Sequence, residues 1–543
     1  MPEFNQVQPS VMRHTFSEVP RAEIPRSTFD RSHGHKTTFD AGYLVPIYVD
    51  EALPGDTFNL SMTGLCRLAT PLHPFMDNIQ LSTFFFAVPI RLLWDNWEKM
   101  NGAQDDPDDS TDYTVPYIDG PDDGYESGSL SDYLGLPTDI YMNVCVFWHR
   151  AYNLIWNEWF RDENLQDRAY IDRSDGPEDA NDGNYILRRR GKRHDYFTSC
   201  LPWPQKGPSV SLPLGSEAPV RGIGKGTQVY GDVDEEVYET GGVQRTYASS
   251  EDMNSGSPSA DQQFRMEEDP SNPGYPAVYA DLTEATAATI NELRQAFQIQ
   301  RMYERDARGG TRYTEIILSH FCVTSPDARL QRPEYLGGGR SPVYVAPVSQ
   351  TSSTADSQGP VDTPQGNLAG VGTATMNGHG FTKSFTEHCI IIGLVSANAD
   401  LTYQQGVNRM FLRETRFDYY WPALSHIGEQ VVENQEIYLD WAQAGTNHGV
   451  FGYQERYAEY RYKPSIITGQ FRSSFPQSLD TWHLAQDFSE LPVLNSEFIE
   501  DDPPVDRVIA VPSEPHFLLD TYFSLRCARP MPVYGVPGLI DHF

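Results

Sequence analysis

Alternating apolar and polar residues mark the first predicted strands. Phe58, Leu60 and Met62 alternate with polar residues, so one face of a strand is apolar. In Ile79–Val88 apolar residues fall on both faces, which is typical of a strand covered on both sides. This stretch includes the three consecutive phenylalanines Phe84–Phe86, and we expect it to be a strand buried between two layers.

A helical period follows this strand. Pro89 can occupy the first position of a helix. Leu93, Trp97 and Met100 are spaced so that they share one helix face, and Gly102 is placed to end the helix.

Further elements follow from the same patterns. Two longer segments, 144–159 and 283–308, have the spacing of amphipathic helices. Short apolar runs predict three more strands, at Thr314–Val323, His388–Ala397 and His516–Cys527.

Long polar stretches interrupt the pattern, notably 205–276 and 337–380, and there is no internal repeat. We therefore expect one all-β domain over residues 43–543 that carries large insertions. Residues 1–42 are predicted to form an irregular, mildly basic N-terminal arm that lies in an interior or at an interface.

The apolar runs are too short for membrane spans. The densest are Phe84–Ile90 and Cys389–Val395, whereas a spanning helix needs roughly 20 apolar residues. The N-terminus shows no apolar stretch of a secretory signal. The six cysteines are scattered without a CxxC pair, which favours reduced thiols in a protein made in the cytosol.

The formal charge of -34 is concentrated in three segments. Residues 100–148 contain eleven acidic residues and no lysine or arginine. Residues 231–270 and 487–506 add most of the remaining excess, and the three segments together carry -27. They are rich in Gly, Pro, Ser and Asn and are interpreted as solvated surface loops. The mild charge elsewhere leaves room for basic patches that face an anionic partner.

The densest basic run is LRRRGKRH at Leu187–His194. Its five basic residues are Arg188, Arg189, Arg190, Lys192 and Arg193. One hypothesis is contact with nucleic-acid phosphates. The other is a subunit contact with one of the acidic loops, and the residues alone favour neither.

A second segment, Glu455–Arg472, interleaves basic residues with tyrosines. Such a pattern can stack on and neutralise single-stranded nucleic acid. A subunit interface enriched in Tyr and Arg is the alternative, and it is somewhat favoured.

Other motifs carry little chemistry. RGIGKGT at Arg221–Thr227 lacks the residue order of a phosphate-binding loop. The acidic run Asp105–Asp112 lacks the register of a calcium loop, and the His/Cys groupings lack structural-zinc spacing. We therefore expect no catalytic residue, metal or cofactor, although 75 acidic residues leave a carboxylate pair of a glycosidase possible in principle.

Several blocks, taken in order along nearly the whole chain, resemble the major capsid proteins of gokushovirus-type microviruses, which are small icosahedral single-stranded-DNA bacteriophages. They include LHPFMDNIQLSTFFFAVPIRLLWDNWEKMNG, SHFCVTSPDARLQRPEYLGGG, DYYWPALSHIGEQVVENQEIYLDW and RYAEYRYKPSIITGQFR. The chain departs from the family pattern at Cys389, where a glycine or another small residue is expected, and over 205–276, which resembles no shared block.

The resemblance implies a single eight-stranded antiparallel viral jelly roll with long loop insertions and a few short helices. The Phe84–Phe86 block would then belong to a jelly-roll strand buried between two sheets. Sixty copies would form a T=1 icosahedral shell around a circular single-stranded DNA genome. The variable insertion 205–276 would form a surface protrusion that contributes to attachment to a host-cell receptor. The chain would be made in the bacterial cytoplasm and reside in the virion, with scaffolding, pilot and small DNA-binding virion proteins as further partners.

One alternative from another class is a soluble, β-rich carbohydrate-active enzyme or lectin. Aromatic residues and surplus acidic residues would then line a glycan cleft. This hypothesis leaves the ordered match of sequence blocks without an explanation.

Overall fold

The computed structural model of the chain describes residues 25–208, 210, 290–310, 313–322, 331–352, 365–441 and 444–534, and short strands between 220 and 280. The chain divides into two compact units. The first consists of Met1–Pro204 together with Thr324–Phe543, and the second is Gln205–Val323.

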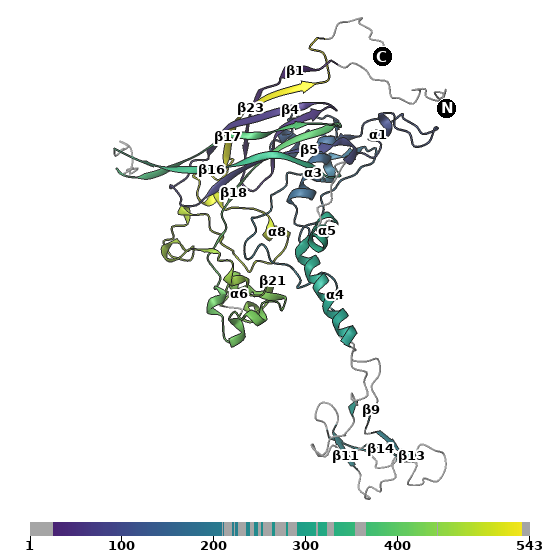
Figure 1. Ribbon diagram of the computed structural model, residues 1–543. Helices are drawn as coiled ribbons and strands as arrows, with labels where there is room; N and C mark the ends of the chain where they lie inside the picture. Colours follow the sequence, from purple (N-terminus) through teal and green to yellow (C-terminus); the bar gives the residue numbers. More distant parts are fainter. Residues whose placement is uncertain are drawn as a thin grey trace, which may run out of the picture. The chain divides into compact units, whose positions relative to one another are not determined.

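The first unit is built on one curled antiparallel sheet of nine strands (Figure 1). The strands are β1 (Ser27–Asp30), β2 (His33–Phe39), β3 (Val45–Ala52), β4 (Thr57–Leu68), β5 (Ile79–Pro89), β16 (Glu334–Ser349), β17 (Leu368–Ser384), β18 (Cys389–Ala399) and β23 (Phe517–Arg529). Their order is β1-β23-β4-β17-β16-β5-β18-β3, with β2 also paired to β23. β1 and β2 pair with successive parts of β23 along one edge, so the sheet has eight strand positions. The expected all-β, antiparallel jelly-roll-like architecture is confirmed.

Strand β16 joins the two halves of this sheet. Its first part, Glu334–Val343, pairs with β5, and its second part, Tyr344–Ser349, pairs with β17. The glycines at 337–339 permit the close approach of β16 to the neighbouring strands. A Cβ atom at Gly338 would lie 2.0 Å from the carbonyl oxygen of Thr83, so no larger residue fits there.

The main hydrophobic core lies between the two halves of the sheet. Tyr48 of β3 contacts Phe523 of β23, with ring centroids 5.2 Å apart. Phe85 of β5 contacts Phe381 of β17 at 5.6 Å. The alternating burial of β4 and β23 places one apolar face of each strand in this core, as their sequences predict.

A second core covers the opposite face of β5 and β18. Phe86 and Ile392 pack there against Tyr152 and other residues of helix α3. The prediction that the phenylalanine block is buried between two sheets therefore holds for Phe85 only. Phe84 and Phe86 face the helical layer, because successive side chains of a strand point to opposite faces.

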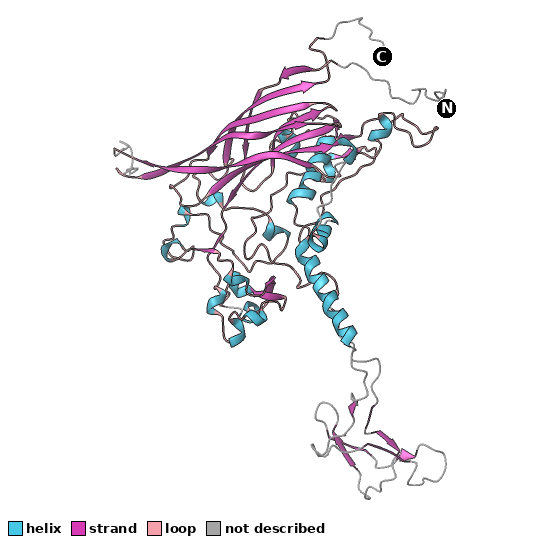
Figure 2. Ribbon diagram, in the orientation of Figure 1, coloured by secondary structure: helices cyan, strands magenta, loops and turns pink. Residues whose placement is uncertain are grey.

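Short helices decorate the first unit (Figure 2). They include α1 (Trp97–Met100), α2 (Leu130–Tyr133), α3 (Phe147–Ile155), α6 (Asn434–Ile437), α7 (Ala444–Asn447) and α8 (Ser496–Ile499). The predicted helix after β5 is two separate turns, Ile90–Leu92 and α1, and Gly102 follows the second with φ +95°. The amphipathic helix predicted over 144–159 is confirmed as α3, which continues into a π-helical turn, Trp156–Phe160.

Helix α3 also carries a buried charge. Arg150 is fully buried, and its Nε donates to Glu178 at 2.7 Å. Its Nη1 donates to the carbonyl oxygen of Leu93 at 2.8 Å. A buried arginine is tolerated only when its donors are satisfied in this way, so the pair ties α3 to the segment after β5.

Short paired strands complete the first unit. They are β6 (Tyr117–Asp119), β7 (Val144–Cys145), β8 (Glu178–Asp179), β19 (Thr402–Tyr403), β20 (Glu429–Glu433), β21 (Val450–Glu455) and β22 (Ser465–Ile466). Of these, β19 to β22 lie in the long region between β18 and β23. An apolar cluster joins Val432 and Phe451 of that region to Phe197, which lies outside it.

The second unit contains α4 (Ile290–Gly309) and α5 (Tyr313–Phe321). Its strands are β9 (Val220–Arg221), β10 (Ile223–Lys225), β11 (Glu235–Tyr238), β12 (Gln244–Tyr247), β13 (Glu251–Asp252), β14 (Gln263–Met266) and β15 (Tyr279–Ala280). The strand predicted at Thr314–Val323 is wrong, because Tyr313–Phe321 form α5. A short apolar run fits either period, and here His320 bonds Asp306 of α4 at 2.6 Å.

The N-terminal segment is more regular than expected. Residues 1–24 lie outside the described residues, but β1 and β2 replace the irregular structure predicted up to residue 42. Local propensity is weak in HGHKTTF, and pairing with β23 decides the conformation. Between β1 and β2, Arg31 forms an ion pair with Asp50 of β3 at 2.7 Å, which links the two ends of the curled sheet.

Two global expectations can be compared with the described residues. No helix among them is both long and apolar enough to cross a membrane. All six cysteines are free thiols; Cys66, Cys200, Cys389 and Cys527 are buried.

The two-sided burial of β5 generates a stability prediction. Phe85→Ala removes a ring that is fully buried between the sheet halves, so the free energy of unfolding should fall by about 3–5 kcal/mol. Leu518→Ala, on the exposed face of β23, is the control and should cost less than about 0.5 kcal/mol. Chemical denaturation measures both, and equal losses would contradict the described core.

Candidate interaction surfaces

The basic run Arg188–Arg193 is threaded between two other parts of the first unit. Its backbone bonds Gly42 and Leu44, next to β3, on one side. On the other side it bonds Ile499 and Asp501, at and after the end of α8. These bonds are 2.7–3.0 Å long, so hydrogen bonds on both sides hold the backbone of the run in place.

Four cations of this run stack on aromatic rings. The distances to the ring centroids are 4.8 Å for Arg188 on Trp156, 4.4 Å for Arg189 on Tyr43, 5.0 Å for Arg190 on Phe84 and 4.7 Å for Lys192 on Phe498. All five basic residues are half-buried. The aromatic faces therefore compensate part of the lost hydration of these cations.

Carboxylates compensate more of the charge. Arg189 pairs with Asp502 at 2.7 Å, and Arg193 pairs with Asp400 at 3.0 Å. Asp502 belongs to the acidic segment 487–506, so the run meets an acidic loop of its own chain. Contact with nucleic acid stays a prediction for these five residues.

A buried carboxyl group lies beside the basic run. Asp501 is buried between the run and the end of α8, and burial raises its pKa to about 7. The nearby ammonium of Lys192 opposes this rise. Burial lowers the pKa of Lys192, whose Nζ donates to the carbonyl oxygen of Phe498 at 2.6 Å.

The second predicted segment, Glu455–Arg472, contributes to an exposed surface. We call it the aromatic–arginine surface. Its members are Arg413, Arg416, Phe417, Tyr419, Tyr420, Trp421, Arg456, Tyr460, Tyr462 and Lys463. Arg413 stacks on Tyr460 at 4.4 Å and on Tyr419 at 5.2 Å, which joins the two chain segments.

Residues 413–421 were missed as site residues by sequence reasoning. The sequence does contain a pattern that could have identified them, because Arg409, Arg413 and Arg416 precede the aromatic run Phe417–Trp421 within a few residues. In the structure Arg416 stacks on Trp421 at 4.7 Å. The Arg456 guanidinium donates to the carbonyl oxygen of Phe417 at 2.8 Å.

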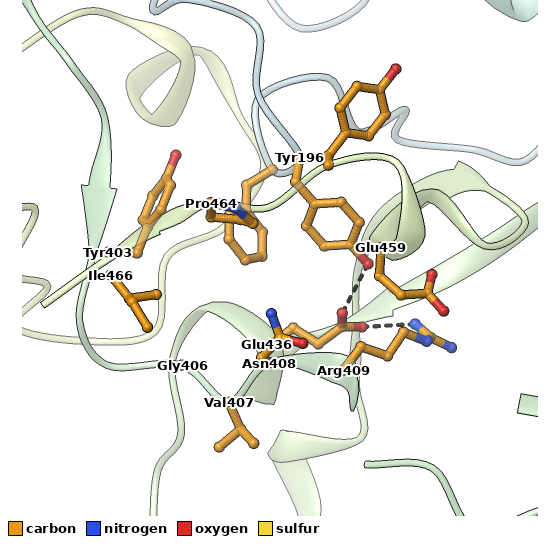
Figure 3. A pocket seen from close by; sticks show the side chains of 12 residues that line it. Tyr196, Tyr403, Gly406, Val407, Asn408, Arg409, Glu436, Glu459, Pro464 and Ile466 are labelled. Atoms are coloured by element: carbon orange, nitrogen blue, oxygen red, sulfur yellow. Dashed lines mark hydrogen bonds and ion pairs between the residues drawn. The ribbon is translucent and has the colours of Figure 1, made fainter. Parts of the chain in front are cut away.

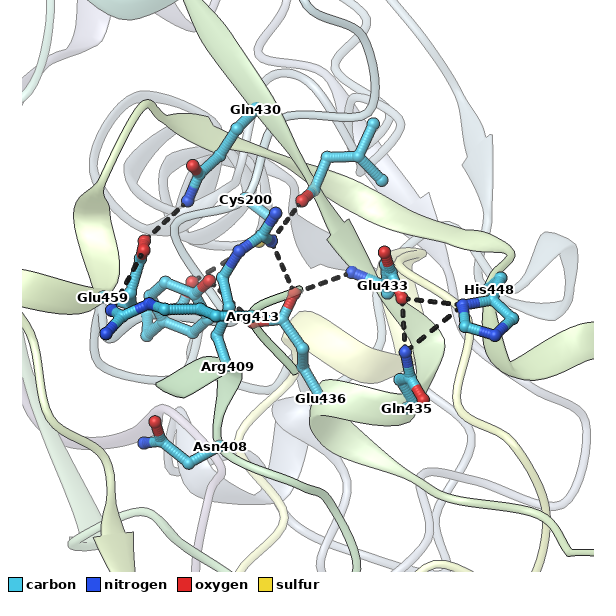
Figure 4. A network of polar contacts seen from close by, with 12 residues as sticks. Cys200, Asn408, Arg409, Arg413, Gln430, Glu433, Gln435, Glu436, His448 and Glu459 are labelled. Carbon is cyan, nitrogen blue, oxygen red and sulfur yellow. Dashed lines mark hydrogen bonds and ion pairs between the residues drawn. The ribbon is translucent and has the colours of Figure 1, made fainter. Parts of the chain in front are cut away.

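A polar network adjoins this surface through Arg413, which lies 3.6 Å from Glu459 (Figure 4). Glu436 of α6 is buried and accepts from Arg409 Nη1 at 2.8 Å and from the Tyr196 hydroxyl at 2.9 Å. Burial raises the pKa of Glu436, and the Arg409 guanidinium opposes the rise. Glu459 accepts from Gln430 at 2.8 Å, so both carboxylates fix loop segments in place.

A small pocket opens beside Glu436, lined also by Tyr196, Tyr403 and Ile466 (Figure 3). It holds about 50 Å³ of space. Small-molecule sites typically measure roughly 300–1,000 Å³. We therefore interpret this group of residues as the support of the aromatic–arginine surface.

The weaker motifs have plain structural roles. In the acidic run 105–112, the Asp109 carboxylate accepts from the backbone N–H groups of Asp105 and Asp106 and lies 4.0 Å from Lys99. The described residues contain no group of three or more His, Cys, Asp or Glu arranged to hold a metal ion. The side chains of RGIGKGT lie outside the described residues.

Asp501 generates a pH prediction. Its folded pKa of about 7 lies above the unfolded value of about 4, so folding favours the protonated form. Its contribution to stability is full below pH 4 and declines as the pH rises to 7. Asp501→Asn removes the titration, so its unfolding midpoint relative to the unsubstituted chain should rise between pH 4 and pH 7. Thermal melts across this range measure the difference, and parallel curves would refute the assignment.

Comparison with known proteins gives a consistent result. The family described as "Capsid protein (F protein)" matches residues 17–539. Capsid protein VP1 of Chlamydia phage 1 is 47% identical over 98% of both chains, and that of Bdellovibrio phage phiMH2K is 46% identical over the same shares. Capsid protein VP1 of Spiroplasma virus 4 is 37% identical over 97% of both chains. These relatives are named as capsid proteins, which argues against the alternative of a carbohydrate-active enzyme or lectin. The chain therefore belongs to the phage capsid F-protein family, in its gokushovirus-type branch.

Proposed function

We propose that sixty copies of this capsid protein form a T=1 icosahedral shell that encloses a circular single-stranded DNA genome. The proposal rests on the family match over residues 17–539. The single jelly-roll-like sheet of the first unit supports it. Icosahedral symmetry offers sixty equivalent positions, so one such unit per chain allows every copy to make the same contacts.

The basic run Arg188–Arg193 is the proposed DNA contact. Arg190 and Arg193 are the candidates within it, because each keeps a guanidinium nitrogen without a hydrogen-bond partner among the described residues. That nitrogen is buried, so contact with a phosphate requires the side chain to move. Arg340 adds positive charge near Arg190. Phosphate oxygens would supply acceptors without reading base sequence. Arg190 also stacks on Phe84 and Arg193 also pairs with Asp400. Arg188, Arg189 and Lys192 instead donate hydrogen bonds to Asn153, Asp501 and Phe498.

The insertion 205–276 is the proposed host-attachment region. It falls within the second compact unit, Gln205–Val323, and it contains the acidic segment 231–270. An acidic segment that belongs to a different compact unit from the sheet can vary in sequence without disturbing the core of that sheet.

Sedimentation tests the shell and its content together. The expressed chain should form one fast, uniform species whose 260/280 nm absorbance ratio shows nucleic acid that resists nuclease and salt. Arg190→Gln with Arg193→Gln should keep the sedimentation rate and lower this ratio. Particles with an unchanged ratio would remove the run as a DNA contact, and a chain that stays slow even with the other phage proteins present would overturn the shell.

Deletion tests the insertion. Particles that lack residues 205–276 should sediment like the full-length particles but no longer adsorb to host cells. Loss of particles would instead assign the insertion a role in assembly, and normal adsorption would locate attachment elsewhere.

A further inference from the structure

We propose that the aromatic–arginine surface of one copy binds the acidic loop 103–126 of a second copy. This inference rests on the proposed function, because it assigns one specific contact to the shell. The loop lies between α1 and α2, and it contains most of the acidic excess of segment 100–148.

The surface is too apolar and too exposed to face water alone. Phe417 is 60% exposed, Tyr462 53% and Trp421 42%. Ile427 and Ile466, which are neighbours in sequence of its two segments, are 60% and 67% exposed. Contiguous exposed aromatic residues of this kind mark interaction sites in soluble proteins.

The composition favours a protein partner over nucleic acid. Its cations are mostly arginine, which is enriched with Tyr, Trp and Phe in the centres of protein interfaces. The exposed aliphatic residues Ile427 and Ile466 add apolar area that bases do not stack on. Arg413 and Arg416 already occupy ring faces of Tyr460 and Trp421, which leaves fewer faces for bases.

The surface is held in shape before any partner arrives. Arg409 and Glu436 fix the first segment to α6, and the Gln430–Glu459 bond fixes the second to β20. The Tyr457 hydroxyl donates to the carbonyl oxygen of Phe417 at 3.0 Å and joins both segments. Ordered side chains lose little conformational entropy on binding, which favours association.

The charge of the surface identifies the complementary partner. Arg416, Arg456 and Lys463 have no acidic partner among the described residues, and Arg416 and Lys463 are exposed. Loop 103–126 presents the opposite charge. Its exposed acidic residues are Asp105, Asp106, Asp108, Asp112, Asp119, Asp122, Asp123 and Glu126.

The loop also presents apolar area. Val115 and Tyr117 are each about 40% exposed within it. Tyr141, 52% exposed, is fixed beside it by a bond from its hydroxyl to Asp119 at 2.9 Å. An interface needs both an apolar centre and complementary charge, and the two surfaces together supply both.

Within one copy, the aromatic–arginine surface does not contact that copy's own loop 103–126. Helix α1 directly precedes the loop, and helix α6 supports the aromatic–arginine surface. The two helices lie at opposite ends of the first unit (Figure 1). The contact must therefore join different copies. Because it pairs two different surfaces, it is a head-to-tail contact, which closes into rings when the rotation is right.

Charge reversal tests the contact. Arg416→Glu with Lys463→Glu should reduce the particle fraction in sedimentation at least tenfold, and so should Asp106→Lys with Asp108→Lys and Asp112→Lys. The combined variant, which carries both reversals, should recover most of the particles. Arg168→Glu with Arg173→Glu makes the same charge change at two exposed arginines elsewhere and should assemble normally.

Three results would overturn the proposal. The surface variant could assemble normally, or the combined variant could assemble no better than either parent. Particles of the surface variant that are intact but contain less DNA would assign this surface to nucleic acid instead. Thermal melts identify variants that fail only because they unfold.

Photo-cross-linking gives a second measurement that does not depend on a complete shell. A benzophenone amino acid at Tyr462 should cross-link to peptides from 103–126 of another copy, detected by mass spectrometry. Adducts only with other segments or with DNA, or no adduct, would refute the contact. If the chain forms no particles but this cross-link appears, the shell proposal fails while the contact stands.

Discussion

Burial of β5 and β18 on both faces is the constraint on which the first unit depends. Phe85 fills the space between the two halves of the curled sheet, while Phe86 and Ile392 on the other face anchor α3. Apolar residues must therefore occupy nearly every position of these strands, which explains the dense phenylalanine and isoleucine runs. The loops that carry the interaction surfaces are insertions around this two-sided layer.

The buried and half-buried cations of the first unit are balanced by neighbouring groups. Arg150 is paired with Glu178 inside the helical layer, and the run Arg188–Arg193 meets rings and the acidic segment 487–506. Half-buried cations then fix loop positions instead of repelling one another. The large negative charge of the chain consequently says little about any one surface. What distinguishes the aromatic–arginine surface is that Arg416 and Lys463 are exposed and have no acidic partner among the described residues.

The sequence predicted strands best where one period was unambiguous. β4 and β23 alternate cleanly, and β18 is a long β-branched run, so their positions followed from the residues. The strand prediction failed at residues 314–321 because a short apolar run fits either a strand or a helix. Only the contact with α4 determines which of the two forms. β1 and β2 depend on pairing with β23, nearly 500 residues away. Of the aromatic–arginine surface, only the segment Glu455–Arg472 was identified from the sequence, because its two segments meet only through tertiary contacts.

Strand β16 has an evolutionary consequence. A Cβ at Gly338 would lie 2.0 Å from a backbone oxygen, and one at Gly339 would lie 2.4 Å from the ring of His379. Every amino-acid change at these codons adds at least that atom, so selection acts on backbone spacing at Gly338 and on the space beside the buried His379 ring at Gly339. Relatives whose loops have diverged in sequence should therefore still encode glycine at these two positions.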